Sequence, residues 1–269
     1  MLSRLEKERY LHHIMLEDVG EEGQLKLLKS SVLVVGAGGL GSAVLMYLCA
    51  AGIGKIGIVD FDMVDMSNLQ RQIIHSQDFL NQSKASSTKS HLKQLNAGIG
   101  IEIFKERFKA HNALSLIEPY DFIIDATDNF NAKFLINDAC VLDDACVLAQ
   151  KPYSYAGVLK YRGQSMSVLP NSACLACVFD KPPKFDKPPK KGLNPISGLF
   201  RVLPGVLGCI QASECLKYFL GFETLLINTL LIADIKTMDF KKIQAPKNPE
   251  CRVCGTHKIT HLQDYEILD

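Results

Sequence analysis

The chain is expected to fold as an α/β domain around a doubly wound, mostly parallel sheet, and two observations predict this. Short apolar runs rich in β-branched residues alternate over residues 31–150 with segments of helical periodicity, the pattern of βαβ units. The first run, at residues 31–35, leads directly into GAGGLG and then a helical stretch, as in the first turn of a Rossmann-like sheet.

Length and composition agree with a single domain over residues 1–269. Hydrophobic residues make up 47% and charged residues 22%, which excludes a disordered or fibrous chain. A net charge of +1 argues against a nucleic-acid or membrane-surface binder. Residues 31–54 carry no charge, but glycines interrupt them repeatedly, so we expect a buried strand, turn and helix instead of a membrane span.

The order of the elements follows from these patterns. The charged opening and residues 24–29 predict N-terminal helices within residues 1–30. Further buried strands are expected at 55–60, 101–105, 121–126 and 145–150, separated by helices that include 42–52, 83–95 and 131–142.

The pattern changes in the second half, over residues 151–269. Residues 163–170 and 225–243 predict longer antiparallel strands that extend the sheet, with a helix over 208–220 between them. Residues 180–191 repeat Lys-Pro-Pro within a charged segment. Because proline breaks both helices and sheet ladders, we expect a mobile surface loop over 180–197.

The glycine-rich turn predicts a phosphate site. Gly36, Gly38 and Gly41 permit a tight turn and let backbone N–H groups approach a phosphate at a helix N-terminus. Asp60 ends the next strand about 20 residues later, where a carboxylate commonly binds ribose hydroxyls. These four residues alone favour a nicotinamide- or flavin-dependent dehydrogenase.

The residues that follow favour a triphosphate instead. Asn68, Arg71, Gln72 and Lys84 come shortly after the second strand, and amides and cations there can neutralise more charge than a pyrophosphate diester carries.

Asp128 and Asn129 follow the strand at 121–126, at the edge where such sheets bind ligands. A carboxylate at that edge is suited to hold Mg²⁺ against phosphate oxygens.

Two cysteine pairs predict a metal site. The first twenty residues lack the apolar segment of a secretory signal, so we expect a reducing, cytoplasmic location. Pairs with two-residue spacing are typical of structural zinc with four thiolate ligands and no open position. The pairs are Cys174 with Cys177 and Cys251 with Cys254. The other five of the nine cysteines are expected to pack as small apolar residues.

Together these motifs resemble the MoeB/ThiF/HesA family of ubiquitin-activating-enzyme-like adenylyltransferases. The resemblance runs from Arg9 to Gly255 and includes, in order, GAGGLGS, the NLQRQ segment (68–72), Lys84, DATDN (125–129) and the two cysteine pairs. It implies a homodimeric enzyme that uses Mg²⁺ and ATP to adenylate a small β-grasp sulfur-carrier protein on its C-terminal glycine. Such carriers end in Gly-Gly and serve molybdenum-cofactor or thiamine synthesis.

The resemblance also implies roles for individual residues. Residues around Gly39 would face the phosphates, Asp60 would hold the ribose, and Asp128 would position Mg²⁺. Arg71, Lys84 and Asp128 are expected to be catalytic. The whole predicted ATP site comprises Gly36, Gly38, Gly39, Gly41, Asp60, Asp62, Ser67, Asn68, Leu69, Gln70, Arg71, Gln72, Lys84, Asp128 and Asn129. Residues 31–150 would form the nucleotide-binding half and 151–269 the carrier-binding half.

Two positions depart from the family's pattern. His12 stands where the family's RYxRQ motif has an arginine that reaches the partner subunit's ATP site. The loop cysteine of thiamine-type relatives falls at or near Asn194, and an amide cannot act as a thiolate nucleophile. We therefore expect adenylation without a thioester, Cys209 and Cys215 being packing residues, and transfer to an external sulfur-donor protein.

Three other functions are compatible with parts of the pattern. The first is adenylation of a small-molecule or tRNA-linked carboxylate, which the near-neutral charge disfavours for tRNA. The second is an NAD(P)-dependent dehydrogenase, which NLQRQ and the cysteine pairs disfavour. The third is an inactive nucleotide-binding scaffold, against which the intact Arg71, Lys84 and Asp128 argue. Neither the carrier nor the sulfur donor can be identified from the sequence.

Overall fold

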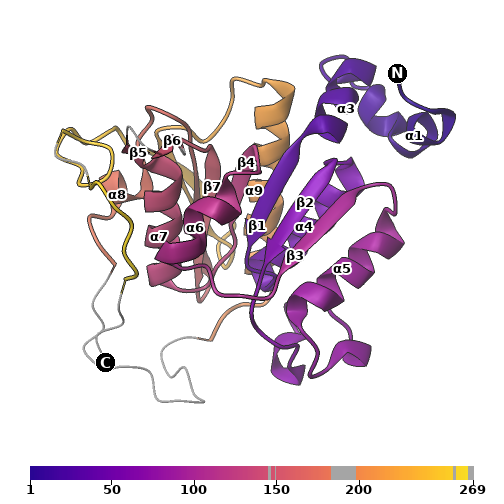
Figure 1. The fold of residues 1–269 in the computed structure, drawn as a ribbon, viewed down its shortest axis with the longest axis horizontal. Helices are drawn as coiled ribbons and strands as arrows, with labels where there is room; N and C mark the ends of the chain where they lie inside the picture. The colour runs from indigo at the N-terminus through magenta and orange to yellow at the C-terminus, as the bar shows by residue number, and fades with distance from the viewer. Residues whose placement is uncertain (145–146, 149, 183–197, 257–258, 266–269) are drawn as a thin grey trace.

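The computed structural model describes residues 1–144, 147–148, 150–182, 198–256 and 259–265. Its centre is one eight-stranded sheet with the order β10-β9-β8-β7-β4-β1-β2-β3 and helices on both faces (Figure 1). The five strands from β7 to β3 are parallel, and β8, β9 and β10 add to them in antiparallel fashion. The predicted doubly wound sheet with an antiparallel extension is confirmed.

The bounds of the elements are as follows. The strands are β1 (Ser31–Val35), β2 (Lys55–Val59), β3 (Gly100–Phe104), β4 (Phe122–Asp125), β5 (Asp143–Asp144), β6 (Val147–Leu148), β7 (Tyr153–Leu159), β8 (Arg162–Val168), β9 (Thr229–Asp234) and β10 (Asp239–Gln244). The α-helices are α1 (Arg4–Arg9), α2 (Leu11–Ile14), α3 (Gly20–Lys29), α4 (Gly39–Ala51), α5 (Lys84–Leu95), α6 (Ala110–Ile117), α7 (Phe130–Val141), α8 (Leu175–Val178) and α9 (Leu203–Leu220). Two short 3-10 helices are η1 (Met66–Asn68) and η2 (Gln77–Phe79).

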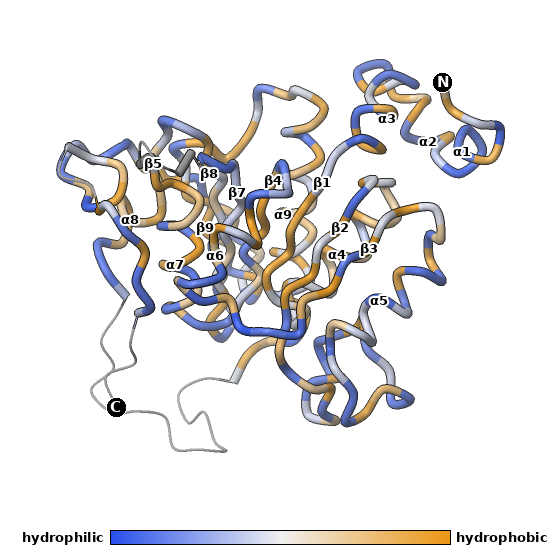
Figure 2. The backbone as a smooth tube through the Cα atoms, in the orientation of Figure 1, coloured by the Kyte–Doolittle hydropathy of each residue, from blue (hydrophilic) through white to orange (hydrophobic). Residues whose placement is uncertain are grey.

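Strand β1 shows why these apolar runs form central strands. Its alternate residues Val32 and Val34 belong to the core beneath α4 and α9, while Leu33 and Val35 belong to the core beneath α6 and α7. Because helices cover both faces, each of the four buried positions, Val32 to Val35, must be apolar. Figure 2 shows the central strands as hydrophobic and the outer helix faces as largely hydrophilic.

The register of the parallel strands gathers their carboxyl ends at one edge. Val35 of β1 pairs with Val59 of β2 and with Asp125 of β4, and Val59 pairs with Phe104 of β3. The polar motifs that follow β1, β2 and β4 therefore emerge side by side.

The prediction that residues 145–150 form a strand of the main sheet is wrong. Residues 145–146 and 149 lie outside the described residues, and β6 pairs with β5 in a separate two-stranded sheet. The fifth parallel strand is β7, beside β4. In its sequence, YSYAGVL, the two tyrosines alternate with the small residues Ser154 and Ala156. Hydrogen bonds to β4 and β8 on both sides hold the strand in the sheet.

The second half also differs in detail from expectation. The run at 225–243 is a hairpin of β9 and β10, in which Met238 adopts a positive φ of 61° at the turn. Helix α9 begins at Leu203, earlier than predicted, with a proline in its first turn. Most of the loop predicted at 180–197 lies outside the described residues, because these exclude 183–197 and with them Asn194.

No helix in the described ranges combines the length and apolar character that a membrane crossing requires.

Candidate functional site

The glycine turn joins the end of β1 to α4 in a space that only glycine fits. Gly36 has φ +101°, and a Cβ there would lie 2.7 Å from the carbonyl oxygen of Ala126. A Cβ on Gly41 would lie 2.0 Å from the carbonyl oxygen of Gly36. The first turn of α4 therefore packs directly against the turn, and the loop after β4 lies against it from the other side.

Asp60 holds this turn from the end of β2. Its Oδ2 accepts a hydrogen bond from the Ala37 N–H at 2.8 Å, and its Oδ1 accepts one from the Asp62 N–H at 2.8 Å. Burial raises the pKa of Asp60, although both hydrogen bonds oppose the shift. Because a carboxylate has about four acceptor positions, Asp60 can fix the turn and still accept from a ribose hydroxyl.

The NLQRQ segment folds over the N-terminus of α4. The Asn68 Oδ1 accepts from Gln72 Nε2 at 2.9 Å and from Arg71 Nη2 at 3.4 Å, while Arg71 Nη1 donates to the Ser67 carbonyl at 3.3 Å. A Cβ on Gly39 would lie 3.7 Å from Arg71 Cγ, so the arginine stem covers the first residue of the helix. A guanidinium is thus held where helix α4 favours an anion.

Gln72 is the buried member of this segment. Its side chain is 4% exposed, its Oε1 has no partner in the described part of the chain, and its Nε2 lies next to Gly38. Leu69 is half-buried, and the exposed Gln70 donates to the Ser67 carbonyl at 3.4 Å. The structure therefore brings Gln72 to the turn and leaves Gln70 at the surface.

Lys84 lies at the start of α5 with a nearly buried ammonium group. Its Nζ is 2.9 Å from Asp62 Oδ2, and its backbone N–H donates to the Asp62 carbonyl at 2.9 Å. The two residues, both predicted as nucleotide ligands, form an ion pair behind Asp60. The Asp62 carboxylate is about half exposed, so Lys84 can exchange this partner for an incoming phosphate oxygen.

Asp128 and Asn129 have different surroundings. Asp128 is exposed and forms no hydrogen bond or ion pair with any other described residue, so its carboxylate is free for a cation. Asn129 caps α7, since its Oδ1 accepts from the Ala132 N–H at 2.8 Å. The structure gives Asn129 a local task that the motif alone did not indicate.

A buried ion pair behind Asp128 was missed by sequence reasoning. Lys133 Nζ lies 3.2 Å from Asp125 Oδ2 and donates to the Ala156 carbonyl at 2.6 Å, and both side chains are almost fully buried. The Thr127 hydroxyl and N–H also donate to Asp125 Oδ1. The loop between Asp125 and Asp128 is therefore held at its base. A lysine between apolar residues, in the segment AKFLI, was its sequence signal.

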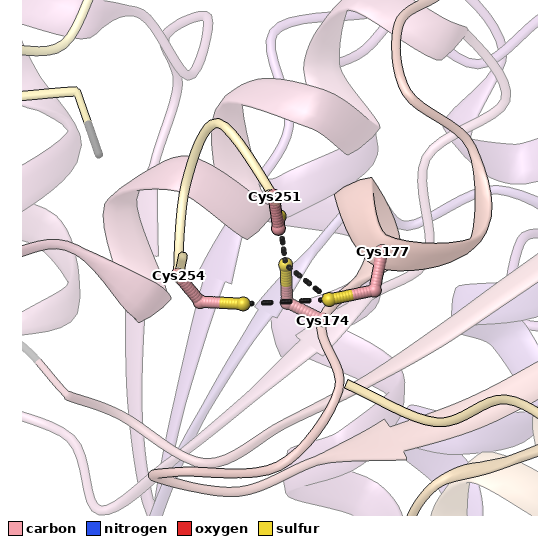
Figure 3. Close-up of side chains that lie close together, drawn as sticks. All are labelled: Cys174, Cys177, Cys251 and Cys254. Carbon is pink, nitrogen blue, oxygen red and sulfur yellow. Dashed lines mark hydrogen bonds between the residues drawn. The ribbon is translucent and has the colours of Figure 1, made fainter. Parts of the chain in front are cut away.

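The four paired cysteines meet at one point, from α8 and from the loop after β10 (Figure 3). Their sulfurs lie within 4.8 Å of one another, at 3.9 Å for Cys174 and Cys177, 3.6 Å for Cys174 and Cys251, and 3.4 Å for Cys177 and Cys254. Disulfide sulfurs are about 2.05 Å apart, whereas tetrahedral zinc with bonds of about 2.3 Å separates its sulfurs by about 3.8 Å. The arrangement fits zinc.

The four thiols share hydrogen bonds, so some sulfurs are stabilised as thiolates at the expense of others. The pKa values of Cys177 and Cys251 are lowered and those of Cys174 and Cys254 are raised, and the Asn248 N–H donates to the Cys177 sulfur at 3.4 Å. Thiolates are the form that binds metals.

The remaining five cysteines differ in burial. Cys49, Cys140 and Cys215 are buried as predicted, Cys146 lies outside the described residues, and Cys209 is exposed, so the prediction that Cys209 packs in the interior is wrong.

His12, on α2, is exposed and forms no hydrogen bond or ion pair with other described residues. Its neighbour His13 contacts Gln24, with Nδ1 3.1 Å from Oε1.

The fold and the site are those of an α/β nucleotide-binding protein, with a glycine turn, the cations Arg71 and Lys84 near it, and a four-cysteine cluster. The sequence model of the ThiF family matches residues 10–253, and the chain belongs to that family. The family expectation from the motifs is confirmed.

The chain is similar in sequence to several proteins whose names state an activity. The chain is 40% identical over 268 residues to the adenylyltransferase and sulfurtransferase MOCS3 of Anopheles gambiae, an alignment that covers 98% of this chain and 59% of that protein. It is 39% identical to the sulfur carrier protein adenylyltransferase of Thermus thermophilus, with 98% and 96% covered, and 35% identical to the SAMP-activating enzyme E1 of Haloferax volcanii, with 100% and 96% covered. The chain thus spans about three fifths of the mosquito protein and nearly all of the other two.

Solved structures share the fold. Escherichia coli MccB in complex with MccA-N7isoASN superposes with a TM-score of 0.79 at 21% identity, over 95% of this chain and 76% of that one. MccB with ATP gives a TM-score of 0.75 at 22% identity, over 94% and 74%.

Proposed function

We propose that this chain is an ATP-dependent adenylyltransferase that activates the C-terminal glycine of a small β-grasp sulfur-carrier protein. The observation that carries the proposal is the juxtaposition, at one sheet edge, of a tight glycine turn at a helix N-terminus, the Arg71 side chain and the exposed carboxylate of Asp128. The names of the Thermus and Haloferax relatives support it. The alignments to these two proteins cover nearly the whole length of both partners.

The site would hold ATP by its phosphates and ribose. Backbone N–H groups of the glycine turn and the N-terminus of α4 favour the phosphates, and Arg71 and Lys84 add positive charge. Asp60 would accept from the ribose, and Asn68 and Gln72 offer amides beside the turn. Asp128 would hold Mg²⁺, which supplies charge neutralisation at the phosphates.

The reaction needs positioning more than covalent chemistry. A carboxylate oxygen of the carrier's terminal glycine attacks the α-phosphorus of ATP, the bond to the leaving oxygen breaks, and pyrophosphate departs with the negative charge. Arg71 and Lys84 stabilise that charge as it develops. The chain holds the two reactants in line, which converts a bimolecular encounter into a bound, oriented pair.

The wider assembly belongs to the same proposal. We expect a homodimer in the cytoplasm, a carrier ending in Gly-Gly that docks on the half formed by residues 151–269, and transfer of the acyl-adenylate to an external sulfur-donor protein. The pathway would be molybdenum-cofactor or thiamine synthesis. The four-cysteine cluster would hold one structural zinc ion, since four ligands leave no open position.

Carrier-dependent exchange of pyrophosphate into ATP tests the proposal. We expect exchange with a sulfur carrier that ends in Gly-Gly and none when its last glycine is removed. Asp128→Ala should reduce exchange by about 10²-fold or more, because metal and phosphate charge is no longer balanced. Its melting temperature should stay unchanged, since Asp128 is exposed and unpaired.

Two outcomes would contradict the proposal. Full exchange activity of Asp128→Ala with Mg²⁺ present would remove the site assignment. Exchange that depends on a free small carboxylic acid or on tRNA, and not on a carrier, would favour the alternative substrates.

A further inference from the structure

His75 is a buried histidine that lies three positions after the NLQRQ segment and contacts the glycine turn. Its side chain is 7% exposed. Its Nε2 lies 2.9 Å from the Ala37 carbonyl oxygen, and its Nδ1 lies 3.0 Å from the hydroxyl oxygen of Ser87 on α5. The imidazole therefore bridges α5 and the turn that begins α4.

The two contacts fix the tautomer of the ring. A carbonyl oxygen can only accept, so Nε2 must carry the proton that bonds to Ala37. Nδ1 then accepts from the Ser87 hydroxyl, which is itself fully buried. Burial lowers the pKa of His75 to about 4, so the ring is neutral near neutral pH and keeps this arrangement.

The bond to Ala37 decides where the next N–H points. In a planar trans peptide the carbonyl and the N–H point in opposite directions. Because His75 holds the Ala37 carbonyl toward the interior, the Gly38 N–H of the same peptide is turned away from it. Gly38 is the N-cap of α4, and its N–H donates to no other described residue.

The preceding peptide is fixed independently. The Ala37 N–H donates to Asp60 at 2.8 Å, so two successive peptides of the turn are each held by one buried side chain. Asp60 was predicted from the motif, whereas His75 was not.

We infer that His75 is a positioning residue for the nucleotide phosphates, holding the peptide between Ala37 and Gly38 so that the Gly38 N–H faces an anion at the N-terminus of α4. This inference rests on the proposed function, because it takes ATP as the ligand of the turn. His75 itself touches neither ATP nor the carrier.

Two substitutions at His75 separate a positioning role from a packing role. His75→Gln places its amide nitrogen as many bonds from Cα as Nε2 is, so it can still donate to Ala37. His75→Asn places its amide nitrogen only as many bonds from Cα as Nδ1 is. It can therefore reach Ser87, but it leaves the Ala37 carbonyl without a donor. The two variants are both polar and uncharged.

The measurement is the dissociation constant of MgATP by calorimetry on the full chain without carrier, together with the melting temperature. We expect His75→Gln to bind within about twofold of the wild type and His75→Asn to bind about tenfold more weakly, as for one lost hydrogen bond. In carrier-dependent exchange, the KM for ATP should rise for His75→Asn while the maximal rate changes less.

Ser87→Ala is the second variant, in case His75→Asn does not fold. It retains the imidazole and the Ala37 carbonyl that selects its tautomer, but removes the hydroxyl that holds Nδ1 against α5. We expect a severalfold loss of ATP affinity, because the ring is then held at one nitrogen only. In ¹⁵N NMR the wild-type imidazole should show the single Nε2–H form, since the Ala37 carbonyl accepts from Nε2.

The inference is overturned if His75→Gln and His75→Asn bind MgATP equally well, or if both lose affinity only in step with their melting temperatures. It is also overturned if Ser87→Ala binds MgATP as tightly as the wild type, or if the wild-type imidazole shows the Nδ1–H form, in which Nε2 cannot donate to the Ala37 carbonyl. Absence of MgATP binding by the wild type would instead refute the proposed function, and the inference with it.

Discussion

Arg252, between the two cysteines of the C-terminal pair, forms a bidentate ion pair with Asp138 of α7. Its Nη1 lies 3.2 Å from Asp138 Oδ2 and its Nη2 lies 3.4 Å from Oδ1. Asp138 is 3% exposed and also accepts from the Tyr265 hydroxyl. Because α7 begins directly after Asn129, this pair ties the cysteine cluster to the helix that follows the Asp128 loop.

Removal of Arg252 should destabilise the fold. Arg252→Ala leaves a buried carboxylate without its cation, although Tyr265 and Asn137 still donate to it. We expect a loss of about 2 kcal/mol, which lowers the melting temperature by roughly 5 °C. The double variant Arg252→Ala with Asp138→Asn should recover part of that loss, since it removes the unpaired charge. Equal melting temperatures of wild type and Arg252→Ala would show that the pair contributes nothing.

The cysteine cluster should contain one zinc ion per chain. Elemental analysis of the purified protein checks this, and a chelator should lower the melting temperature before it affects adenylation of pre-bound substrate. Cys254→Ser should lose the metal. Cys209→Ser is the matched control, because Cys209 is exposed and outside the cluster, and it should keep both zinc and stability. Metal-free protein with four free thiols would contradict the assignment.

Local patterns predicted most of the fold and part of the site. Strands β1, β2 and β4 were predictable because helices cover both of their faces, which demands nearly unbroken apolar runs. The glycine turn, Asp60 and the cysteine pairs were predictable because their chemistry depends on short spacings. Strand β7 was missed because its two tyrosines alternate with the small residues Ser154 and Ala156, so its first half lacks the aliphatic, β-branched run that is typical of a buried parallel strand.

Contacts between distant segments were not predictable. His75 meets Ala37 from 38 positions away, and Arg252 meets Asp138 across 114 positions. Nothing in the residues around a histidine or an arginine specifies such a partner, because the fold alone brings the segments together. Lys133 likewise becomes the partner of Asp125 only once β4 and α7 pack.

Lys84 and Arg71 should act on the adenylation step. Lys84→Met or Arg71→Ala is expected to slow pyrophosphate exchange at saturating ATP and carrier by about 10²-fold, because each side chain stabilises charge on the leaving phosphates. Stability should change little for Lys84→Met, since its partner Asp62 is about half exposed and is then solvated. A raised KM for the carrier with an unchanged maximal rate would make these residues docking residues instead.

Protonation of His75 should make the stability of the fold depend on pH. The pKa of His75 is lowered from 6.5 to about 4, chiefly by burial and further by the positive charges of Lys84 and His91. Between these two values the unfolded chain binds a proton that the folded chain does not. Stability must therefore fall as the pH falls through this window, by up to about 1.4 kcal/mol per pH unit.

His75→Gln provides the comparison for this pH dependence, because glutamine does not titrate while the carboxylates, including the nearby Asp60, remain the same. The free energy of unfolding of the wild type minus that of His75→Gln, measured with urea, should decrease as the pH falls from about 7 to about 5. A difference that stays constant over this range would mean that His75 protonates in the folded chain as easily as in the unfolded one. The neutral imidazole would then not be the form that holds the Ala37 carbonyl.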